Sequence, residues 1–206
     1  MAAASIGQVH EAVTIDGKKV AMKIQYPGVR ASIDSDMNNF LRLITVLNIF
    51  PWGLFLKELI ENTWAELHTE CDYMNEALML NTKWEFLEAW KFENDYYVPS
   101  TVDHLCTPNI LTQEFIYGLP IDEVAVLPQE TRDWVGTLLL KICLYELFIF
   151  KFMQTDPNPA NFYYCNNTGW LNLIDYGSAR HFDDKFVENY FEIVDGSFTN
   201  DKERIH

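Results

Sequence analysis

Two short acidic segments lie close together in the chain and carry residue types suited to phosphoryl transfer. The first, at residues 156–161, reads DPNPAN, and the second, at residues 175–177, reads DYG. Phosphoryl transfer needs a carboxylate near the attacking oxygen, an amide on a metal ion, and a second carboxylate between the metal and the phosphates. Asp156, Asn161 and Asp175 fit these three positions. Each segment alone is an ordinary turn sequence, so the prediction depends on their occurring together and in this order.

The stretch between the two segments explains how they could meet. A turn signal, NNTG, occupies residues 166–169, and an apolar run follows from Leu171 to Ile174. This pattern predicts two short strands joined by a turn. We expect the strand that ends at Ile174 to bring Asp175 to the same place as the first segment.

A β-hairpin is predicted near the N-terminus. Residues 8–15 and 18–26 read as strands, and the Asp-Gly pair between them favours a type I′ turn. In the second strand Lys23 projects from the face opposite the larger aliphatic side chains. A lysine on such a strand is usually a surface residue, but AMKI at residues 21–24 matches the pattern of the phosphate-pairing lysine of kinases.

The segment before this hairpin, AAASIGQ at residues 2–8, stands where protein kinases have a glycine-rich loop. Alanine methyl groups restrict the backbone and fill space over the phosphates, so nucleotide would bind in an altered geometry. Read alone, the alanine run is equally consistent with the start of a helix. The candidate nucleotide contacts in it are Ala2, Ala3, Ala4 and Ser5.

Apolar residues at helical spacing predict most of the remaining elements. Helices are expected over residues 31–50, over 54–90 as more than one helix, over 129–153, and over 183–198 with Asp183 as its cap. The predicted core residues of the third are Trp134, Leu138, Ile142, Tyr145 and Ile149.

Short apolar runs predict the rest of the small sheet. They lie at residues 96–98, at Val102 and at residues 109–115. The segment QEFIYG at 113–118 reads as a hinge between lobes, and its backbone, at Glu114 among others, would hydrogen-bond the edge of an adenine.

Composition limits the classes of function. The chain has 206 residues, of which 49% are hydrophobic, so it can bury a substantial core. Its formal net charge of -15, without a cluster of lysine and arginine, argues against nucleic-acid binding. The four cysteines are far apart and predict free thiols in a reducing compartment. No targeting segment is visible, and the apolar stretch at 138–153 reads as a buried helix.

Several of these segments together resemble the UbiB family of atypical, aarF-domain kinase-like proteins, in particular its mitochondrial branch tied to coenzyme Q (ubiquinone) biosynthesis. The resemblance is carried by AAASIGQV at 2–9, AMKIQYPGV at 21–29, ECDY at 70–73, and QTDPN at 154–158, which has no His-Arg before its aspartate. It extends across nearly the whole chain.

The resemblance implies an α+β, two-lobed, protein-kinase-like fold. We expect a small antiparallel-sheet N-lobe with extra helices at residues 1–117 and a mostly helical C-lobe at 118–206, incomplete at both ends relative to the family. Glu76 matches the helix glutamate that pairs with the strand lysine. Glu70 and Asp72 match a Glu-x-Asp motif whose basic partner, Lys-x-Gly-Gln, lies in an extension that this sequence does not include; a solvated helix face is the alternative.

The implied function is that of an atypical kinase-like ATPase that binds ATP or ADP with Mg²⁺ and supports coenzyme Q biosynthesis. Lys23 and Glu76 would position the phosphates, and Asn161 and Asp175 would hold the metal. Asp156 would orient or deprotonate the attacking group, which could belong to water, a small or lipid-like molecule, or a protein.

The implied partners are nucleotide, lipid or quinone precursors, and coenzyme Q biosynthetic proteins. The implied location is mitochondrial, on the matrix side of the inner membrane, with peripheral membrane association through segments outside this sequence. An alternative is a nucleotide-binding scaffold or an inactive truncated pseudokinase. An ordinary protein kinase is disfavoured by the alanine loop, the missing His-Arg-Asp and the lack of Ala-Pro-Glu after residue 177.

Overall fold

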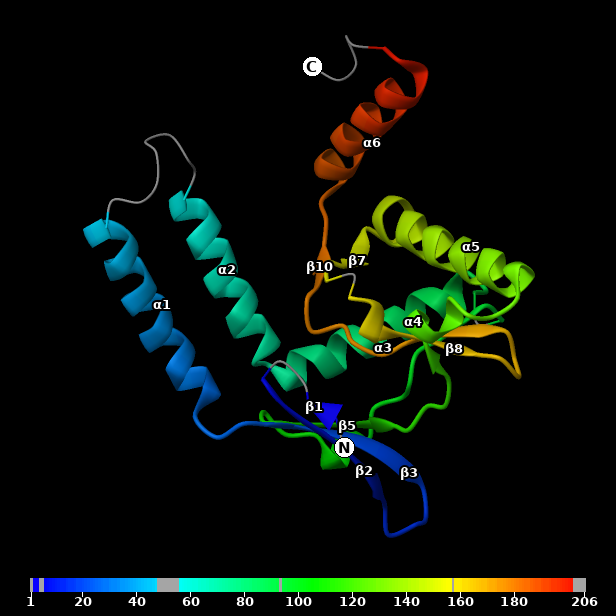
Figure 1. Ribbon diagram of the computed structural model, residues 1–206, viewed down its shortest axis with the longest axis horizontal. Coiled ribbons are helices and arrows are strands. Elements are labelled where there is room, and N and C mark those ends of the chain that lie inside the picture. The colour runs from blue at the N-terminus through cyan, green and yellow to red at the C-terminus, as the bar shows by residue number, and fades with distance from the viewer. Residues whose placement is uncertain (1, 4–5, 48–55, 93, 157, 202–206) are drawn as a thin grey trace. The chain divides into compact units, whose positions relative to one another are not determined.

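The computed structural model describes residues 2–3, 6–47, 56–92, 94–156 and 158–201. The chain forms two compact units that are each discontinuous in sequence (Figure 1). Unit 1 comprises Met1–Asn81 and Pro99–Phe115, and unit 2 comprises Thr82–Val98 and Ile116–His206. These units are defined by contacts, and the lobe boundary expected after residue 117 stays a prediction.

Unit 1 is built on an antiparallel four-stranded sheet with the order β1-β2-β3-β5. The strands are β1 (Ala2–Ala3), β2 (Gly7–Val13), β3 (Lys19–Gln25) and β5 (Ile110–Glu114). The predicted hairpin is confirmed as β2 and β3. The alanine run begins as a strand rather than a helix, because β1 pairs with β2.

The turn of the hairpin differs from the prediction. The last ladder pair is Val13 with Lys19, so the connection is longer than a two-residue turn. Gly17 has a positive φ of 85° while Asp16 does not, and a type I′ turn requires positive φ at both central residues. The Gly17 N–H donates to the Thr14 carbonyl at 2.9 Å, and the type I′ prediction was therefore wrong.

Among the described residues, three α-helices belong wholly or partly to unit 1. They are α1 (Val29–Leu47), α2 (Leu56–Glu70) and α3 (Tyr73–Ala89), the last of which continues into unit 2. The predicted 54–90 segment is thus two helices. The break falls at Cys71–Asp72, where the Asp72 carboxylate accepts a hydrogen bond from the Asn75 N–H at 3.1 Å. Asp72 therefore caps α3, and it does not lie on one continuous helix with Glu70.

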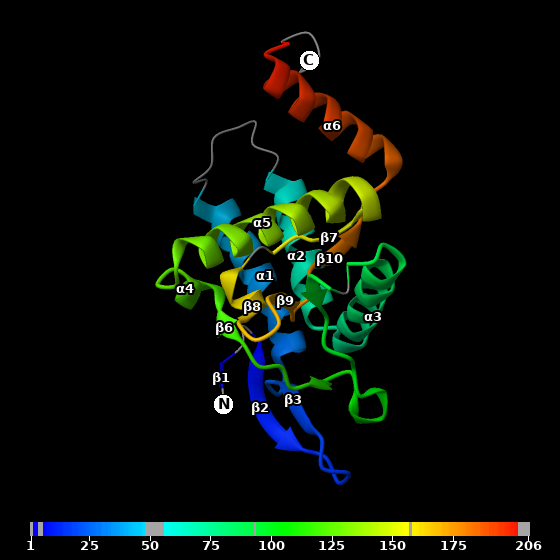
Figure 2. The ribbon, with the colours of Figure 1, turned by 90° about the vertical axis from the view of Figure 1, so that its right-hand side faces the viewer.

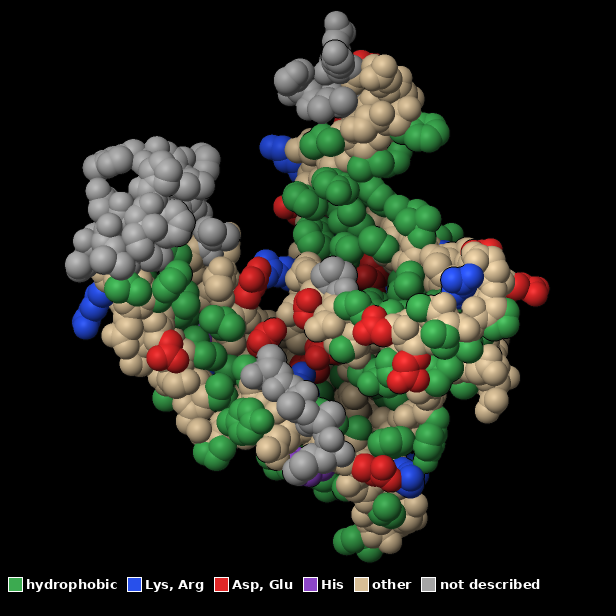
Figure 3. All heavy atoms as spheres, in the orientation of Figure 1, with side chains coloured by type: hydrophobic (Ala, Val, Ile, Leu, Met, Phe, Trp, Pro, Cys, Tyr) green, Lys and Arg blue, Asp and Glu red, His purple; other side chains and the backbone are tan. Residues whose placement is uncertain are grey.

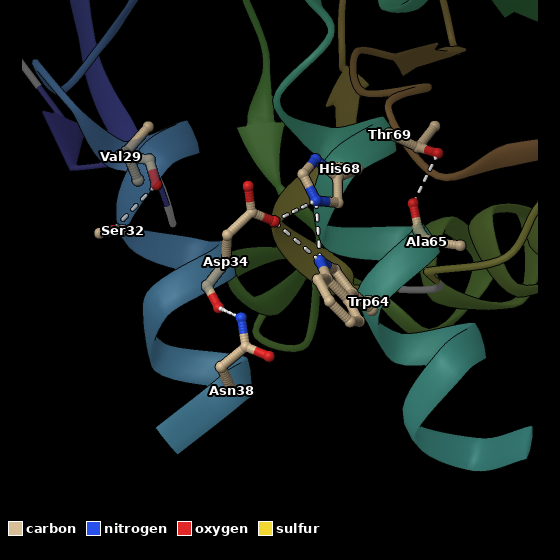
Figure 4. A network of polar contacts seen from close by, with 8 residues as sticks. All are labelled: Val29, Ser32, Asp34, Asn38, Trp64, Ala65, His68 and Thr69. Atoms are coloured by element: carbon tan, nitrogen blue, oxygen red, sulfur yellow. Dashed lines mark hydrogen bonds and ion pairs between the residues drawn. The ribbon is translucent and has the colours of Figure 1, made fainter. Parts of the chain in front are cut away.

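A polar cluster joins α1 to α2 (Figure 4). The Trp64 indole N–H donates to Asp34 Oδ1 at 3.0 Å, and His68 Nε2 lies 2.8 Å from the same oxygen. The hydrogen bond from Trp64, followed by that from His68, lowers the pKa of the Asp34 carboxyl. The cluster fixes the register of the two helices against each other.

The described residues of unit 2 form two small sheets. The first has the order β4-β9-β8-β6, from β4 (Tyr96–Tyr97), β9 (Trp170–Leu173), β8 (Phe162–Cys165) and β6 (Leu119–Pro120). The second pairs β7 (Phe152–Gln154) with β10 (Ala179–His181). The strand expected at residues 96–98 was assigned to the wrong sheet, because β4 runs parallel to β9 in unit 2.

The main helix of unit 2 ends earlier than predicted. It consists of α5 (Gln129–Tyr145) and a π-helical turn, η2 (Glu146–Phe150), after which Lys151 takes a left-handed conformation. The wider π turn shifts the buried face, so that Phe150 is buried and Ile149 is exposed. Leu138 and Ile142 are buried as predicted. Trp134 is exposed, because its indole N–H reaches out to the Gly169 carbonyl.

The core of unit 2 includes the contact of α5 and α4 (Ile121–Val124) with the larger sheet, which lies beneath α5 in Figure 2. Val124, Val135 and Tyr164 form its buried centre. The last helix, α6 (Asp184–Thr199), is capped as predicted, since the Asp183 carboxylate accepts from the Phe186 N–H at 2.7 Å. Apolar side chains gather along α6 at the surface (Figure 3).

Two further expectations can be compared with the described residues. All four cysteines carry free thiols. None of the described helices is both long enough and apolar enough to cross a membrane.

The close approach of Gly7 on β2 to the backbone of β3 leads to a prediction about stability. A Cβ atom at this position would lie 2.3 Å from the Ile24 carbonyl oxygen, so Gly7→Ala should destabilise the protein by about 1–3 kcal/mol. Gly136→Ala is the matched control, because a Cβ there meets no atom within 4 Å and should stabilise α5 by roughly 0.5–1 kcal/mol. Urea unfolding measures both; a Gly7→Ala variant as stable as the parent would contradict the packing.

Candidate functional site

The candidate phosphate lysine, Lys23, forms a buried ion pair with Glu76 in unit 1. Its Nζ donates to both carboxylate oxygens of Glu76, at 3.1 Å and 3.0 Å. The side chain of Lys23 is 17% exposed and that of Glu76 is 2% exposed. Charges removed from water in this way are stable only when they are paired and hydrogen-bonded, so each side chain fixes the position of the other.

The start of α3 is fastened to β3, and this places Glu76 opposite Lys23. The Gln25 side-chain amide donates to the Cys71 carbonyl at 3.1 Å, immediately before α3 begins. Helix α3 begins at Tyr73, whose ring centre is 5.2 Å from Lys23 Nζ. Glu76 follows within the same turn, so the strand and the helix meet at the ion pair.

The face of the sheet that carries Lys23 also carries Gln113. In the ladder between β3 and β5, Lys23 lies opposite Leu111 and Ala21 lies opposite Gln113, so these side chains share one face. Gln113 Oε1 is shielded from solvent and accepts no hydrogen bond from the residues that the structure describes. A buried acceptor of this kind favours a donor supplied by a ligand.

The predicted hinge residue Glu114 directs its side chain to the other face of the sheet. It pairs with Val20, and both residues line a cavity of about 630 Å³. The Ser100 hydroxyl donates to the Glu114 carboxylate at 3.3 Å. The Glu114 N–H donates to the Ser100 carbonyl at 2.9 Å, so a main-chain contact of Glu114 with nucleotide would use its carbonyl oxygen.

Only part of the alanine loop can be placed. Ala2 and Ala3 form β1, where they lie opposite Val9 and Gln8. The predicted contacts Ala4 and Ser5 lie outside the described residues.

The two acidic segments of unit 2 face each other because two ladders frame them. On one side β7 pairs with β10, and Gln154 lies opposite Ala179. On the other side β8 pairs with β9, and Phe162 lies opposite Leu173. The Asp156 loop, residues 155–161, and the Asp175 loop, residues 174–178, are each held at both ends by these pairs. The structure therefore confirms that the strands bring the two segments together.

Short polar contacts tie the loops to each other. The Ile174 N–H donates to the Asn161 carbonyl at 3.2 Å, and the Thr155 hydroxyl donates to the Ser178 carbonyl at 2.6 Å. Within the first loop the Asn161 amide donates to the Asp156 carbonyl at 3.4 Å. These contacts leave the Asp156 side chain exposed, where it could meet a substrate.

The Asp175 carboxylate is partly buried and lies over the next residues of its own loop. Its Oδ1 accepts from the Gly177 N–H at 3.0 Å. An aspartate and a nearby asparagine suit Mg²⁺, which prefers oxygen ligands and retains several waters. Among the described residues there is no cluster of three or more His, Cys, Asp or Glu side chains that could hold a metal without further ligands. A metal held by Asp175 and Asn161 would therefore need phosphate oxygens and water as its remaining ligands.

Sequence reasoning missed the role of Gln154. Its buried side chain joins both loops: Oε1 accepts from the Asp156 N–H at 3.2 Å, and Nε2 donates to the Asp175 carbonyl at 2.6 Å. The signal was present in QTD at residues 154–156, where a glutamine stands at the histidine position of His-Arg-Asp. An amide can donate and accept at once, so it can span two loops.

The Lys23–Glu76 pair makes a prediction about stability. Lys23→Met should destabilise the chain by roughly 3–5 kcal/mol, because it removes the lysine ammonium from a carboxylate that is almost fully buried. The double variant Lys23→Met/Glu76→Met should recover most of that loss. Lys19→Met is the control on the same strand: its partner is Glu11, both side chains are about half exposed, and the loss should stay below about 1 kcal/mol.

Urea unfolding of the four proteins tests this expectation. Equal losses in the Lys23→Met and Lys19→Met variants would show that the Glu76 charge is not buried as described.

Comparison with known proteins places these features in a family. The model of the ABC1 atypical kinase-like domain matches residues 1–206. The chain is 42% identical to atypical kinase coq-8, mitochondrial, of Caenorhabditis elegans, over 99% of this chain and 27% of that protein. It is 43% identical to atypical kinase COQ8B, mitochondrial, of Rattus norvegicus, over 99% of this chain and 38% of that protein. The chain thus spans about a third of the length of these relatives.

Solved structures with the same fold confirm the α+β, protein-kinase-like architecture predicted from the sequence. The Rv3197–erythromycin complex from Mycobacterium tuberculosis superposes with a TM-score of 0.76 at 28% identity, over 99% of this chain and 51% of that one. The Rio2 kinase complex with ADP/Mg²⁺ and phosphoaspartate from Chaetomium thermophilum has a TM-score of 0.52 at 12% identity, over 93% and 50%. By its sequence along the whole length and by its fold, the chain belongs to the ABC1 atypical kinase-like family.

Proposed function

We propose that this chain is the nucleotide-binding core of an atypical kinase-like ATPase that supports coenzyme Q biosynthesis. The observation that carries the proposal is the buried Lys23–Glu76 ion pair, at about 3 Å, on the sheet of unit 1. Kinase-type phosphoryl transfer requires a lysine fixed by such a glutamate, since the lysine must be held where it meets the phosphates. A buried ion pair is a weak means of stabilising a small sheet, because removing two charges from water costs about as much free energy as their attraction returns. A role in phosphate binding gives a reason for the pair.

Each predicted residue has a role that its surroundings support. Lys23, fixed by Glu76, positions the phosphates. Asn161 and Asp175 hold Mg²⁺, which would neutralise charge on the phosphate oxygens. Asp156 orients the attacking group or takes its proton, and its exposed position within a loop tied down at both ends is consistent with this role.

Gln113 extends the proposal to the nucleotide base. Its buried, unsatisfied Oε1 lies on the sheet face of Lys23 and could accept a hydrogen bond from the amino group of adenine. The main chain at Glu114 would then meet the edge of the same base. Ala2 and Ala3 of β1, with Ala4 and Ser5, would cover the phosphates with methyl groups where protein kinases use glycine.

The biological setting is proposed from the relatives. The C. elegans and rat proteins are mitochondrial atypical kinases. We extend the mitochondrial location from them to this chain. The matrix side of the inner membrane is proposed from the family resemblance of the sequence. The proposed partners are lipid or quinone precursors and coenzyme Q biosynthetic proteins. The phosphoryl acceptor remains water, a lipid-like molecule or a protein hydroxyl, because Asp156 could serve any of these.

Turnover of ATP by the purified chain tests the proposal. The parent should release several equivalents of phosphate for each chain with Mg²⁺ present, and Asp156→Asn should lower the rate by about 100-fold or more while nucleotide affinity changes by less than about twofold. Asp183→Asn is the control, because either residue caps α6.

The outcomes separate the candidates. Nucleotide binding without turnover in the parent would favour a scaffold or pseudokinase. Full turnover in Asp156→Asn would remove Asp156 from the chemistry. A folded parent that neither binds nor turns over ATP would overturn the proposal for this chain.

A further inference from the structure

Unit 2 contains a second buried ion pair, which none of the proposed steps uses. Glu146 opens the π-helical turn η2 and is 5% exposed, and Lys83 of α3 is fully buried. The Lys83 ammonium donates to Glu146 Oε1 at 2.8 Å. Burial lowers the pKa of Lys83, and the charge and hydrogen bond of Glu146 oppose this shift. A pair this deeply buried is maintained only where its remaining hydrogen bonds are also satisfied.

The other bonds of Glu146 lead to the two loops. Its Oε1 also accepts from the Tyr176 hydroxyl at 2.9 Å, and its Oε2 accepts from the Gln154 N–H at 3.3 Å. Tyr176 directly follows Asp175. Gln154 contacts Asp156 and Asp175 through its side chain. The Glu146 carboxylate therefore hydrogen-bonds to Tyr176, which is next to Asp175, and to Gln154, which contacts Asp156.

Tyr176 is suited to this contact. It is 2% exposed, its ring stacks on Phe152 at 6.2 Å, and Lys83 Nζ lies 5.8 Å from its ring centre. Its hydroxyl donates to the Glu146 carboxylate at 2.9 Å. Phenylalanine in the same place would fill the space without fixing the loop. The hydroxyl of Asp-Tyr-Gly thus has a defined acceptor.

We propose that Glu146, held by Lys83, is the positioning residue for both the Asp156 loop and the Asp175 loop. It acts through Tyr176 on the metal-binding side and through Gln154 on the side of the attacking group. Its effect on Mg²⁺ binding rests on the proposed function, whereas its effect on loop order does not. A purely structural pair would stabilise unit 2 without changing the order of these loops.

The test compares Tyr176→Phe with Tyr96→Phe in the purified chain. Both substitutions remove one buried tyrosine hydroxyl from unit 2. The Tyr96 hydroxyl donates at 2.7 Å to the Leu138 carbonyl of α5, and Tyr96 lies on β4, outside both loops. The midpoint of urea unfolding should fall in both variants. The acceptor that loses its bond is the Glu146 carboxylate in Tyr176→Phe and the Leu138 carbonyl in Tyr96→Phe.

Amide hydrogen exchange gives a readout that needs no nucleotide. The Asp156 N–H donates to Gln154, and the Gly177 N–H donates to Asp175. A typical buried hydrogen bond corresponds to a change of about two- to tenfold in an equilibrium. Tyr176→Phe should speed exchange at the Asp156 and Gly177 amides by about that factor relative to Tyr96→Phe. Equal rates in the two variants would overturn the proposal.

The magnesium requirement of ATP turnover is the second readout. The Mg²⁺ concentration for half-maximal turnover should rise by about two- to tenfold in Tyr176→Phe and stay within about twofold in Tyr96→Phe. An unchanged requirement beside faster amide exchange would contradict the link to metal binding. If the parent does not turn over ATP, the proposed function fails, and the exchange rates still decide whether Glu146 positions the loops.

Discussion

The structure depends on the pairing of carboxylates that have been removed from water. Glu76 and Glu146 are both almost fully buried, and each receives a lysine ammonium at about 3 Å. An unpaired charge in either place would be strongly destabilising, so each pair restricts the side chains and backbones around it. Helix α3 supplies one member of each pair, Glu76 in unit 1 and Lys83 in unit 2, about two helical turns apart.

The two pairs constrain different parts of the candidate chemistry. In unit 1 the pair fixes the lysine itself, together with the start of α3 and the β3 strand. In unit 2 the pair makes no direct bond to Asp156 or Asp175. It is connected to their loops through Gln154 and Tyr176. The ladders at the ends of the loops set their separation, and the buried amide and phenol set their orientation. Residues that bind and react can then remain partly exposed while their supports are buried.

The parts of this arrangement that the sequence could predict are those with local signals. The β2–β3 hairpin, the cap of α6 and the two strands between the acidic loops follow from turn residues, capping residues and apolar runs. The pairing of Lys23 with Glu76 came from a family pattern, and it is confirmed as a contact in the structure. The chemical roles of these residues stay predictions.

The parts that could not be predicted depend on distant contacts or on a change of helical period. The residues around Lys83 on α3 show no pattern that marks this lysine as buried. Its burial depends on Glu146, which is far along the chain. The π turn at Glu146 shifts the buried face by a fraction of a turn, and a uniform helical period therefore gave Ile149 as core. The short strand β4 pairs with β9, which is far along the chain. The residues of β4 and of β9 carry no signal that they pair with each other.

The central claim is that the chain has a magnesium-dependent nucleotide site, and its thermal midpoint tests this most directly. The purified chain would be melted with Mg-ATP, with ATP and a chelator, and with Mg²⁺ alone, beside Asp175→Asn. A ligand at a hundred times its dissociation constant adds about 2.7 kcal/mol, which should raise the midpoint by about 5–10 °C for a chain of this size. The account predicts this rise with Mg-ATP only, and its loss in Asp175→Asn. A folded chain whose midpoint is the same under all three conditions would contradict it.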